Sequence, residues 1–223
     1  MEQLTAGVSP HNNSYTYKGR LEDEIKKSIF ELVKNGGNIA DLGCSLGVTT
    51  IDLARRFPNS FVYGVDMDEE VLSKHNRVFL PCGTGFNVMG FPEVYGIEKP
   101  NRNNYELVQA QIPELPFNEE FFTTMFDMNN SYYSVYNSLM RMRQEEGRDA
   151  FRRYFSRITS YIEDGGLYII SGDFCVSELR HRDIETMVFR KRKEKMSLEL
   201  FENESLGDKS SVAEYISDCI ILN

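Results

Sequence analysis

A glycine turn followed at a fixed distance by an acid constrains the fold of this chain more than any other feature. The segment Asp41-Leu42-Gly43-Cys44-Ser45-Leu46-Gly47 lies between an apolar stretch, 38–42, and a stretch with helical spacing, 49–57. A glycine turn between a strand and a helix lets a ligand approach the backbone, and the helix start offers unpaired N–H groups. Nineteen residues after Gly47, the next expected strand ends in Asp66, whose carboxylate can accept hydrogen bonds from both hydroxyls of a ribose.

The hydrophobic pattern around this turn alternates between strand and helix. Expected strands cover 38–42, 61–65, 106–109, 122–128 and 167–171, and expected helices cover 21–34, 49–57, 68–78 (with Asp68 as N-cap) and 150–162. Strand–helix–strand units imply parallel strands joined by right-handed crossovers. The prediction is an α/β fold with a three-layer, Rossmann-like, doubly wound and mostly parallel sheet, which binds ligands at the carboxyl ends of its strands.

The ends of the chain and one internal stretch depart from this alternation. Residues 1–20 form a polar arm, and 21–223 are expected to form one α/β domain. A glycine-, proline- and aromatic-rich insertion at 79–104 is too long for an ordinary connection, so it is expected to be a lid or a mobile surface loop. Near the C-terminus, 184–189 and 196–201 are expected as a strand pair and 210–216 as a helix, in an order that stays open.

Charge bears on the kind of partner. The formal net charge of −9 argues against a general attraction to nucleic acid. Two basic stretches are exceptions, and their simplest interpretation is a solvated face balanced by neighbouring acids. They comprise Arg141, Arg143, Arg148, Arg152, Arg153 and Arg157, and the run Arg190-Lys191-Arg192-Lys193.

Composition also predicts a cytoplasmic protein without a metal. The apolar runs are too short to cross a bilayer, and the first residues lack the features of a secretory signal. The cysteines Cys44, Cys82, Cys175 and Cys219 are too far apart to form a disulfide framework or a zinc site. The histidines His11, His75 and His181 are isolated from one another, so no metal site is predicted.

The glycine spacing distinguishes between two kinds of nucleotide cofactor. The dinucleotide fingerprint requires glycines at its first, third and sixth positions, where this chain has Gly43, Ser45 and Val48. Asp41 would also place a carboxylate close to a pyrophosphate, which is unfavourable. A ligand that carries an ammonium and a sulfonium group would tolerate that charge.

The same residues resemble the motifs of class I S-adenosylmethionine-dependent methyltransferases. The segment from Asp41 to Gly47 resembles motif I, with Ser45 in place of the usual middle glycine. Val65-Asp66-Met67 resembles the motif whose acid binds ribose and whose next side chain packs on adenine. The stretch 110–117 is similar to the segment D-x-x-x-L-P-F, with Gln111 at the place of an acidic adenine contact.

This resemblance covers roughly residues 20–172 and implies S-adenosylmethionine as cofactor. It assigns cofactor binding to Asp41, Gly43, Ser45, Gly47, Asp66, Met67 and Gln111. Three short segments, 13–15, 40–45 and 129–132, also resemble plant carboxyl methyltransferases of small acids, although the chain lacks the long helical cap of those enzymes.

Methyl transfer is an in-line displacement in which the protein mainly orients the reactants and excludes water, so no universal catalytic side chain is expected. Asp127 and Asn129, after the fourth strand, and His181, after the fifth, are the catalytic candidates; the alternatives are a polar turn and a structural histidine. Tyr15, Tyr17, Asn130 and Tyr133 are candidates for substrate or lid contacts.

The leading functional hypothesis is methyl transfer to an oxygen or nitrogen atom of a small molecule, with no nucleic-acid or membrane partner. Two alternatives stay open. The first is an RNA or protein methyltransferase that uses the arginine-rich stretch, which requires those arginines on one open face beside the methyl group. The second is a protein that binds S-adenosylmethionine without turnover. The acceptor and the oligomeric state are left undetermined by the sequence.

Overall fold

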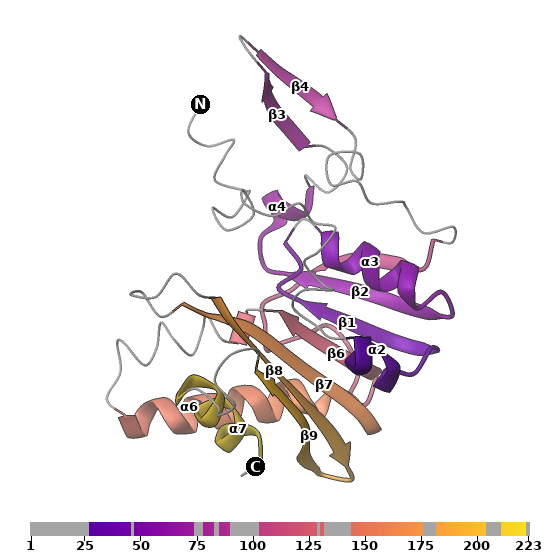
Figure 1. The fold of residues 1–223 in the computed structure, drawn as a ribbon. Coiled ribbons are helices and arrows are strands. Elements are labelled where there is room, and N and C mark those ends of the chain that lie inside the picture. Colours follow the sequence, from indigo (N-terminus) through magenta and orange to yellow (C-terminus); the bar gives the residue numbers. More distant parts are fainter. Residues whose placement is uncertain are drawn as a thin grey trace.

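The computed structural model describes residues 27–45, 47–73, 78–82, 85–89, 103–128, 130–131, 144–175, 182–203 and 211–221. Its centre is a seven-stranded sheet with the order β5-β2-β1-β6-β7-β8-β9 (Figure 1). The elements are α2 (Lys27–Leu32), β1 (Gly37–Leu42), α3 (Val48–Arg56), β2 (Ser60–Asp66), α4 (Glu69–Ser73), β3 (Val78–Cys82), β4 (Gly85–Met89), β5 (Tyr105–Gln109), β6 (Phe122–Met128), α6 (Gln144–Ser160), β7 (Ile162–Cys175), β8 (Arg182–Arg192), β9 (Lys195–Asn203) and α7 (Ser211–Ile221).

Five neighbouring strands of the sheet are parallel. β1 pairs with β2 on one side and with β6 on the other, while β5 and β7 extend the parallel part outward. The register places Leu42 of β1 opposite both Val65 of β2 and Asp127 of β6, so these strands end at the same edge. That edge carries the glycine turn and the acids singled out from the sequence.

The far side of the sheet is antiparallel, which makes the sheet mixed. β8 runs antiparallel to β7, and β9 runs antiparallel to β8. Only residues 176–181 separate β7 from β8, and a crossover between parallel strands needs about a dozen residues or more. The chain therefore turns back directly. The α/β prediction is confirmed, and the strand pair expected at 184–189 and 196–201 is β8 and β9.

Helices cover both faces of the sheet. On one face, Ile29 and Val33 from the α2 segment and Leu53 from α3 pack on Ile39 and Ile169. The opposite face holds the larger cluster, to which α6 contributes Phe151, Phe155 and Ile158, and α7 contributes Val212, Ala213 and Ile216. The three layers follow from these two cores (Figure 1).

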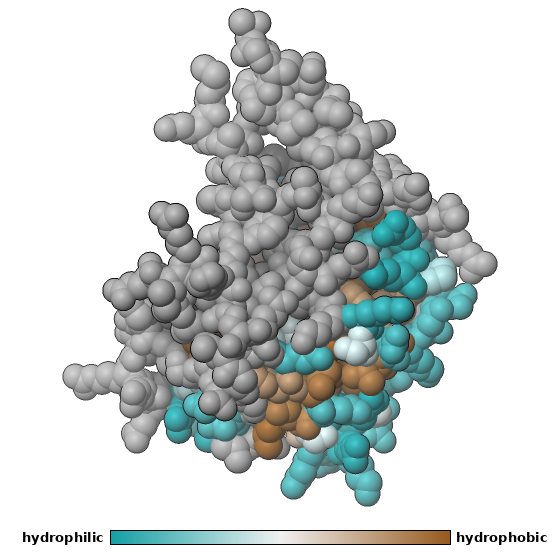
Figure 2. Space-filling view, viewed as in Figure 1, coloured by the Kyte–Doolittle hydropathy of each residue, from teal (hydrophilic) through white to brown (hydrophobic). Residues whose placement is uncertain are grey.

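Apolar surface gathers on one side of the molecule. Figure 2 shows hydrophobic residues where α2 meets strands β7 and β8, with hydrophilic residues around them. Phe30, Leu32 and Leu200 are among the partly buried residues that pack against the core under α2 and α3. No helix within the described ranges is long and apolar enough to cross a membrane.

Some boundaries predicted from the sequence were wrong. Within the described residues, the helix expected at 68–78 covers Glu69–Ser73, and Val78 already belongs to β3. The Asp68 carboxylate accepts a hydrogen bond from Val71 N at 3.1 Å, as expected of an N-cap. The helix expected at 150–162 runs from Gln144 to Ser160, and the strand expected at 167–171 begins at Ile162. Gly165 has a φ of 81°, which lets the expected turn at 164–166 lie inside the long strand β7.

The insertion at 79–104 contains a hairpin that the sequence pattern did not predict. β3 and β4 pair antiparallel, with Val78 opposite Met89 and Cys82 opposite Gly85, and form a separate two-stranded sheet (Figure 1). Residues 90–102 of the insertion, the arm at 1–20 and the first part of the helix expected at 21–34 lie outside the described residues.

Candidate functional site

The turn after β1 has the left-handed backbone that its glycines predict. Gly43, Ser45 and Gly47 have φ angles of 70°, 51° and 76°. The amides of Gly43 and Cys44 both donate to Val65 O, at 2.8 and 3.0 Å, so the turn folds back onto the end of β2. Gly47 is the N-cap residue of α3, and no side chain caps this helix start. The first backbone N–H groups of a helix point outward along its axis, so the turn before α3 is a suitable place for a polar ligand.

The Asp66 carboxylate connects two loops at this edge. Its Oδ2 accepts a hydrogen bond from Ser45 N at 2.8 Å, and its Oδ1 accepts one from Asp68 N at 3.0 Å. The backbone carbonyl of Asp66 also accepts from Ala110 N at 3.0 Å, which joins the ends of β2 and β5. The carboxylate is half-buried and held in a fixed position against the glycine turn.

Met67, directly after Asp66, is an exposed hydrophobic residue. Its relative exposure is 71%, and Ile221, at 41%, is the other large hydrophobic residue with comparable exposure in the described ranges. Gln109 Nε2 donates to Met67 O at 3.4 Å, and Gln111 is exposed just after β5. Met67 and Gln111 therefore lie at the same corner of the sheet, beside Asp66.

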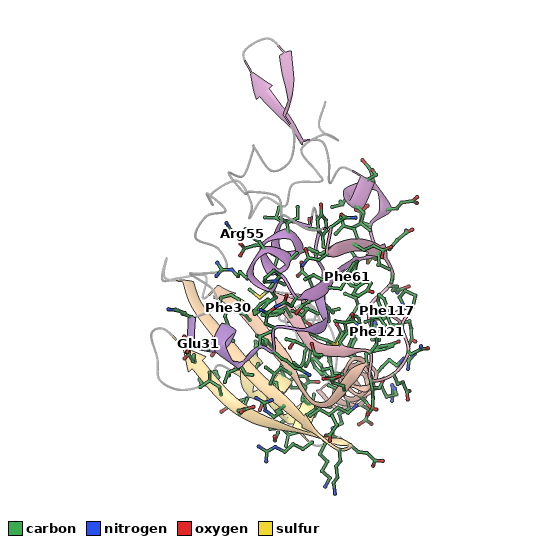
Figure 3. All side chains as sticks on the ribbon, turned by 90° about the vertical axis from the view of Figure 1, so that its right-hand side faces the viewer. Phe30, Glu31, Arg55, Phe61, Phe117 and Phe121 are labelled. Carbon is green, nitrogen blue, oxygen red and sulfur yellow. The ribbon has the colours of Figure 1, made fainter. Side chains whose placement is uncertain are left out.

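Aromatic packing anchors the segment that joins β5 to β6. Figure 3 shows Phe117 and Phe121 beside each other, and their rings are stacked at 5.0 Å. Tyr63 of β2 packs edge-on against Phe117 at 5.0 Å. The Tyr161 hydroxyl accepts from Leu115 N at 3.0 Å and donates to Leu115 O at 3.1 Å. These contacts fix the segment that carries Gln111.

Asp41 lies beneath the turn rather than on its surface. It is 1% exposed, and its Oδ2 accepts a hydrogen bond of 2.6 Å from the Thr50 hydroxyl of α3. The hydrogen bond ties the end of β1 to the helix that follows the turn. Burial, with the nearby charges of Asp41 and Asp66, raises the pKa of the Cys44 thiol, so this cysteine stays protonated. The position of Asp41 makes it a support of the turn, and its cofactor contact stays a prediction.

Asp127, at the end of β6, is the centre of a buried hydrogen-bond cluster. It has no exposed surface. Its Oδ1 accepts from Ser131 N at 2.9 Å, and its Oδ2 accepts from the hydroxyls of Ser131 and, at 2.8 Å, Tyr168. Burial raises the pKa of Asp127, while the hydrogen bonds from Ser131, Tyr168 and Asn130 lower it in part. Both oxygens are thus engaged, and the catalytic role of Asp127 stays a prediction.

Asn130 lies between this cluster and the glycine turn. Its Nδ2 donates to the Tyr154 hydroxyl at 3.0 Å. A Cβ atom placed on Gly43 would lie 3.2 Å from Asn130 Cβ and 3.6 Å from its Oδ1. The structure therefore brings Asn130 and Gly43 together, and the predicted contact of Asn130 with a substrate or lid stays a prediction.

The remaining predicted residues fall elsewhere. Tyr15, Tyr17, Asn129, Tyr133 and His181 lie outside the described residues. Sequence reasoning missed Tyr154 and Tyr168, because neither stands next to a motif; only their place in an apolar helix and strand could have indicated buried hydroxyls that need partners. Ser171 and Thr186, whose hydroxyls are 3.0 Å apart, were missed for the same reason. No group of three or more metal-binding side chains occurs in the part of the chain that the structure describes.

The arginines of α6 have local partners. Arg157 is 3.1 Å from Glu114 and 3.7 Å from Glu119, and Arg152 is 3.6 Å from Asp149. The guanidinium of Arg148 lies over the Tyr215 ring at 5.8 Å. A shallow surface depression lined by Glu119, Asp149, Arg152, Arg153, Ser156, Arg157 and Ser160 mixes both signs of charge. The described arginines therefore do not form a purely basic face.

Replacing Ser45 by glycine is expected to stabilise the fold by about 1 kcal/mol, because a side chain at positive φ is strained and glycine is not. Ser45 has a φ of 51° and its amide is hydrogen-bonded to Asp66, so the backbone cannot relax. Urea denaturation of the Ser45→Gly variant measures the gain. Gly47→Ala, at a φ of 76°, is the matched control and should lose stability by a similar amount. A Ser45→Gly variant no more stable than the wild type would contradict the inference that the backbone of Ser45 is strained.

The chain matches known proteins by structure and not by sequence. No protein-family model matches the chain, and no curated protein matches its sequence. Its structure is similar to solved structures of S-adenosylmethionine-dependent methyltransferases. One is such an enzyme from Aquifex aeolicus, with 12% identity, 77% of this chain and 72% of that chain covered, and a TM-score of 0.46.

Two further similar structures are larger proteins. Geranyl diphosphate C-methyltransferase from Streptomyces coelicolor has 15% identity, with 77% of this chain and 49% of that chain covered and a TM-score of 0.43. The cyclase SpnF has 15% identity, with 69% and 44% covered and a TM-score of 0.42. The chain thus spans about half the length of these two proteins.

Proposed function

We propose that this chain binds S-adenosylmethionine at the edge formed by β2, β1 and β6 and transfers its methyl group to an oxygen or nitrogen atom of a small molecule. One observation carries the proposal. The Asp66 carboxylate is fixed by two backbone amides against a left-handed glycine turn, with the exposed Met67 next to it.

The hydrogen bonds of Asp66 leave room for a ribose. A carboxylate has about four lone-pair sites, and Ser45 N and Asp68 N occupy two of them. The two sites that are left match the two hydroxyls of a ribose in number. Because the amides hold the carboxylate in place, ligand binding does not have to pay for ordering it.

The neighbours of Asp66 fix the direction of the ligand along the edge. Met67 offers exposed apolar surface for an adenine ring at the β5 side, and Gln111 lies at the same corner. The sheet order β5-β2-β1-β6 then directs the rest of the ligand over the glycine turn towards β6. The methyl group moves from the sulfonium to the acceptor, S-adenosylhomocysteine is left, and the acceptor releases its proton.

Charge favours a small acceptor over RNA. The chain has a net charge of −9, and three arginines of α6, Arg148, Arg152 and Arg157, pair with acids or lie over an aromatic ring. A non-catalytic binding protein is the second candidate. One observation favours this second candidate. Asp127 is the one candidate catalytic residue whose side chain is described, and its carboxyl is buried with both oxygens accepting hydrogen bonds.

Calorimetric titration with S-adenosylmethionine and S-adenosylhomocysteine tests cofactor binding. Asp66→Ala is expected to raise Kd at least about 30-fold, because hydrogen bonds to a charged partner contribute roughly 1.5–3 kcal/mol each. Asp68→Ala is the matched control. It removes an equal charge two positions away and only uncaps α4, so its Kd should stay within about threefold of the wild type.

Either of two results would contradict the cofactor assignment: a folded wild-type chain that binds neither ligand, or an Asp66→Ala chain that binds both as tightly as the wild type. Transfer of a labelled methyl group is then measured against panels of small hydroxyl and amine compounds, RNA and protein. Labelling of small compounds is the expected result. Binding without labelling of any panel would identify the non-catalytic alternative.

A further inference from the structure

A tyrosine from α6 controls the side chain that faces the glycine turn. The Tyr154 hydroxyl accepts a hydrogen bond from Asn130 Nδ2 at 3.0 Å. The Asn130 side chain also donates towards the Asp127 carboxyl. The two halves of an amide point in opposite directions, so the bond to Tyr154, together with Asp127, fixes where the oxygen of Asn130 lies. The oxygen is 3.6 Å from the point where a Cβ on Gly43 would lie. In the described part of the chain, no donor is hydrogen-bonded to it.

Tyr154 is held by the core and cannot easily move away from Asn130. Its ring packs edge-on against Phe155 at 5.1 Å and against Phe151 at 6.3 Å. Burial, together with the charge of Asp127, raises the pKa of the Tyr154 hydroxyl, so it remains neutral and can accept a hydrogen bond at every physiological pH. The orientation of the Asn130 amide therefore depends on the packing of α6 against the sheet.

The position of Asn130 relative to Asp66 indicates which part of the ligand it meets. From β2 to β6 there are two strand spacings, or about 10 Å. A ligand with its ribose on Asp66 and its adenine on the β5 side directs its amino-acid end towards β1 and β6. The donor group at that end of S-adenosylmethionine is an ammonium, and an amide oxygen is a suitable acceptor for it.

We propose that Tyr154 is a positioning residue: it holds the Asn130 amide with its oxygen towards Gly43, where the oxygen accepts a hydrogen bond from the ammonium group of S-adenosylmethionine. The inference rests on the proposed cofactor, and it adds a residue from outside the motifs that resemble those of methyltransferases. The hydroxyl of Tyr154 reaches the ligand through Asn130, so its loss affects the part of the ligand that carries the ammonium.

Two ligands separate this role from a merely structural one. S-adenosylhomocysteine carries the ammonium, whereas 5′-methylthioadenosine has the same adenosine and sulfur without the amino-acid part. Calorimetric titration of the full chain is expected to show that Tyr154→Phe weakens S-adenosylhomocysteine binding by about five- to tenfold, the effect of one hydrogen bond of about 1 kcal/mol or slightly more. The Kd for 5′-methylthioadenosine should change less than twofold.

Two further variants serve as controls. Asn130→Asp keeps an acceptor oxygen and lets Tyr154 donate to it, so S-adenosylhomocysteine should bind at least as tightly as to the wild type. Tyr161→Phe also removes a buried tyrosine hydroxyl, the one bonded to Leu115, directly after the end of α6. It should lower the melting temperature without changing the ratio of the two Kd values.

The outcomes are distinguishable. Equal weakening of both ligands by Tyr154→Phe, no weakening of either, or an Asn130→Asp chain that binds S-adenosylhomocysteine as poorly as Tyr154→Phe would overturn the role of Tyr154 and leave the cofactor assignment intact. If the wild-type chain binds neither ligand, the cofactor assignment fails, and this inference fails with it.

Discussion

A Gly64→Val chain is expected to lose on the order of 4 kcal/mol of its free energy of unfolding. A Cβ atom on Gly64 of β2 would lie 2.4 Å from the Thr50 hydroxyl, 2.7 Å from a Leu107 methyl group and 3.0 Å from the Cys44 sulfur. Thr50 cannot rotate away without breaking its 2.6 Å hydrogen bond to the buried Asp41. The added side chain would therefore push α3 away from the sheet and disturb the glycine turn before it.

Urea denaturation followed by circular dichroism measures this loss. Gly165→Ala is a matched control because nothing lies within 4 Å of its added Cβ and only its φ of 81° is unfavourable. The control should lose roughly 1–2 kcal/mol. A Gly64→Val chain that loses no more than the control would show that α3 does not pack on β2 at this position.

Asp127→Ala is expected to destabilise the fold by about 3 kcal/mol, because removing one partner of a buried polar cluster leaves the other groups without hydrogen bonds. The groups affected are Ser131 N and the hydroxyls of Ser131 and Tyr168. Asp127→Asn keeps an acceptor for Ser131 N, and the two hydroxyls can rotate, so its loss near neutral pH should be about 1 kcal/mol or less.

The same pair of chains should differ in its dependence on pH. Burial raises the pKa of Asp127 above its ordinary value in the folded state. The stability that its protonated form contributes is then fully present below the unfolded pKa of about 4 and is lost as pH rises through the raised folded pKa. As pH rises above about 4, wild-type stability should therefore fall relative to Asp127→Asn. Parallel curves would contradict a raised pKa at Asp127.

Local features of the site could be predicted from the sequence because each depends on neighbouring residues. Gly43 and Gly47 indicate a left-handed turn, and apolar alternation places it between β1 and α3. The spacing from Gly47 to Asp66 is the length of one helix and one strand, so it placed the acid at the same edge. Asp68 was correctly predicted as an N-cap because its contact with Val71 spans only three residues.

Contacts between distant segments were not predictable in this way. The order of the last strands could not be predicted from the sequence. The patterns of β8 and β9 are those of ordinary strands, and such a pattern does not specify which strand of the sheet each one pairs with. The hairpin of β3 and β4 was interpreted as a lid or loop, since proline and glycine obscure the strand alternation there. The burial of Asp127 depends on its contacts with Ser131 and with Tyr168 of β7.

The sequence by itself determined the α/β alternation, the glycine turn and the place of Asp66, because these follow from local backbone preferences and from the period of the hydrophobic pattern. Only the tertiary structure decided that the sheet ends in an antiparallel pair, that Asp127 lies inside a cluster with Ser131 and Tyr168, and that Tyr154 holds Asn130 against Gly43. Those arrangements depend on side chains from separate elements that are buried together. A polar group finds its hydrogen-bond partner there only when packing removes both groups from water.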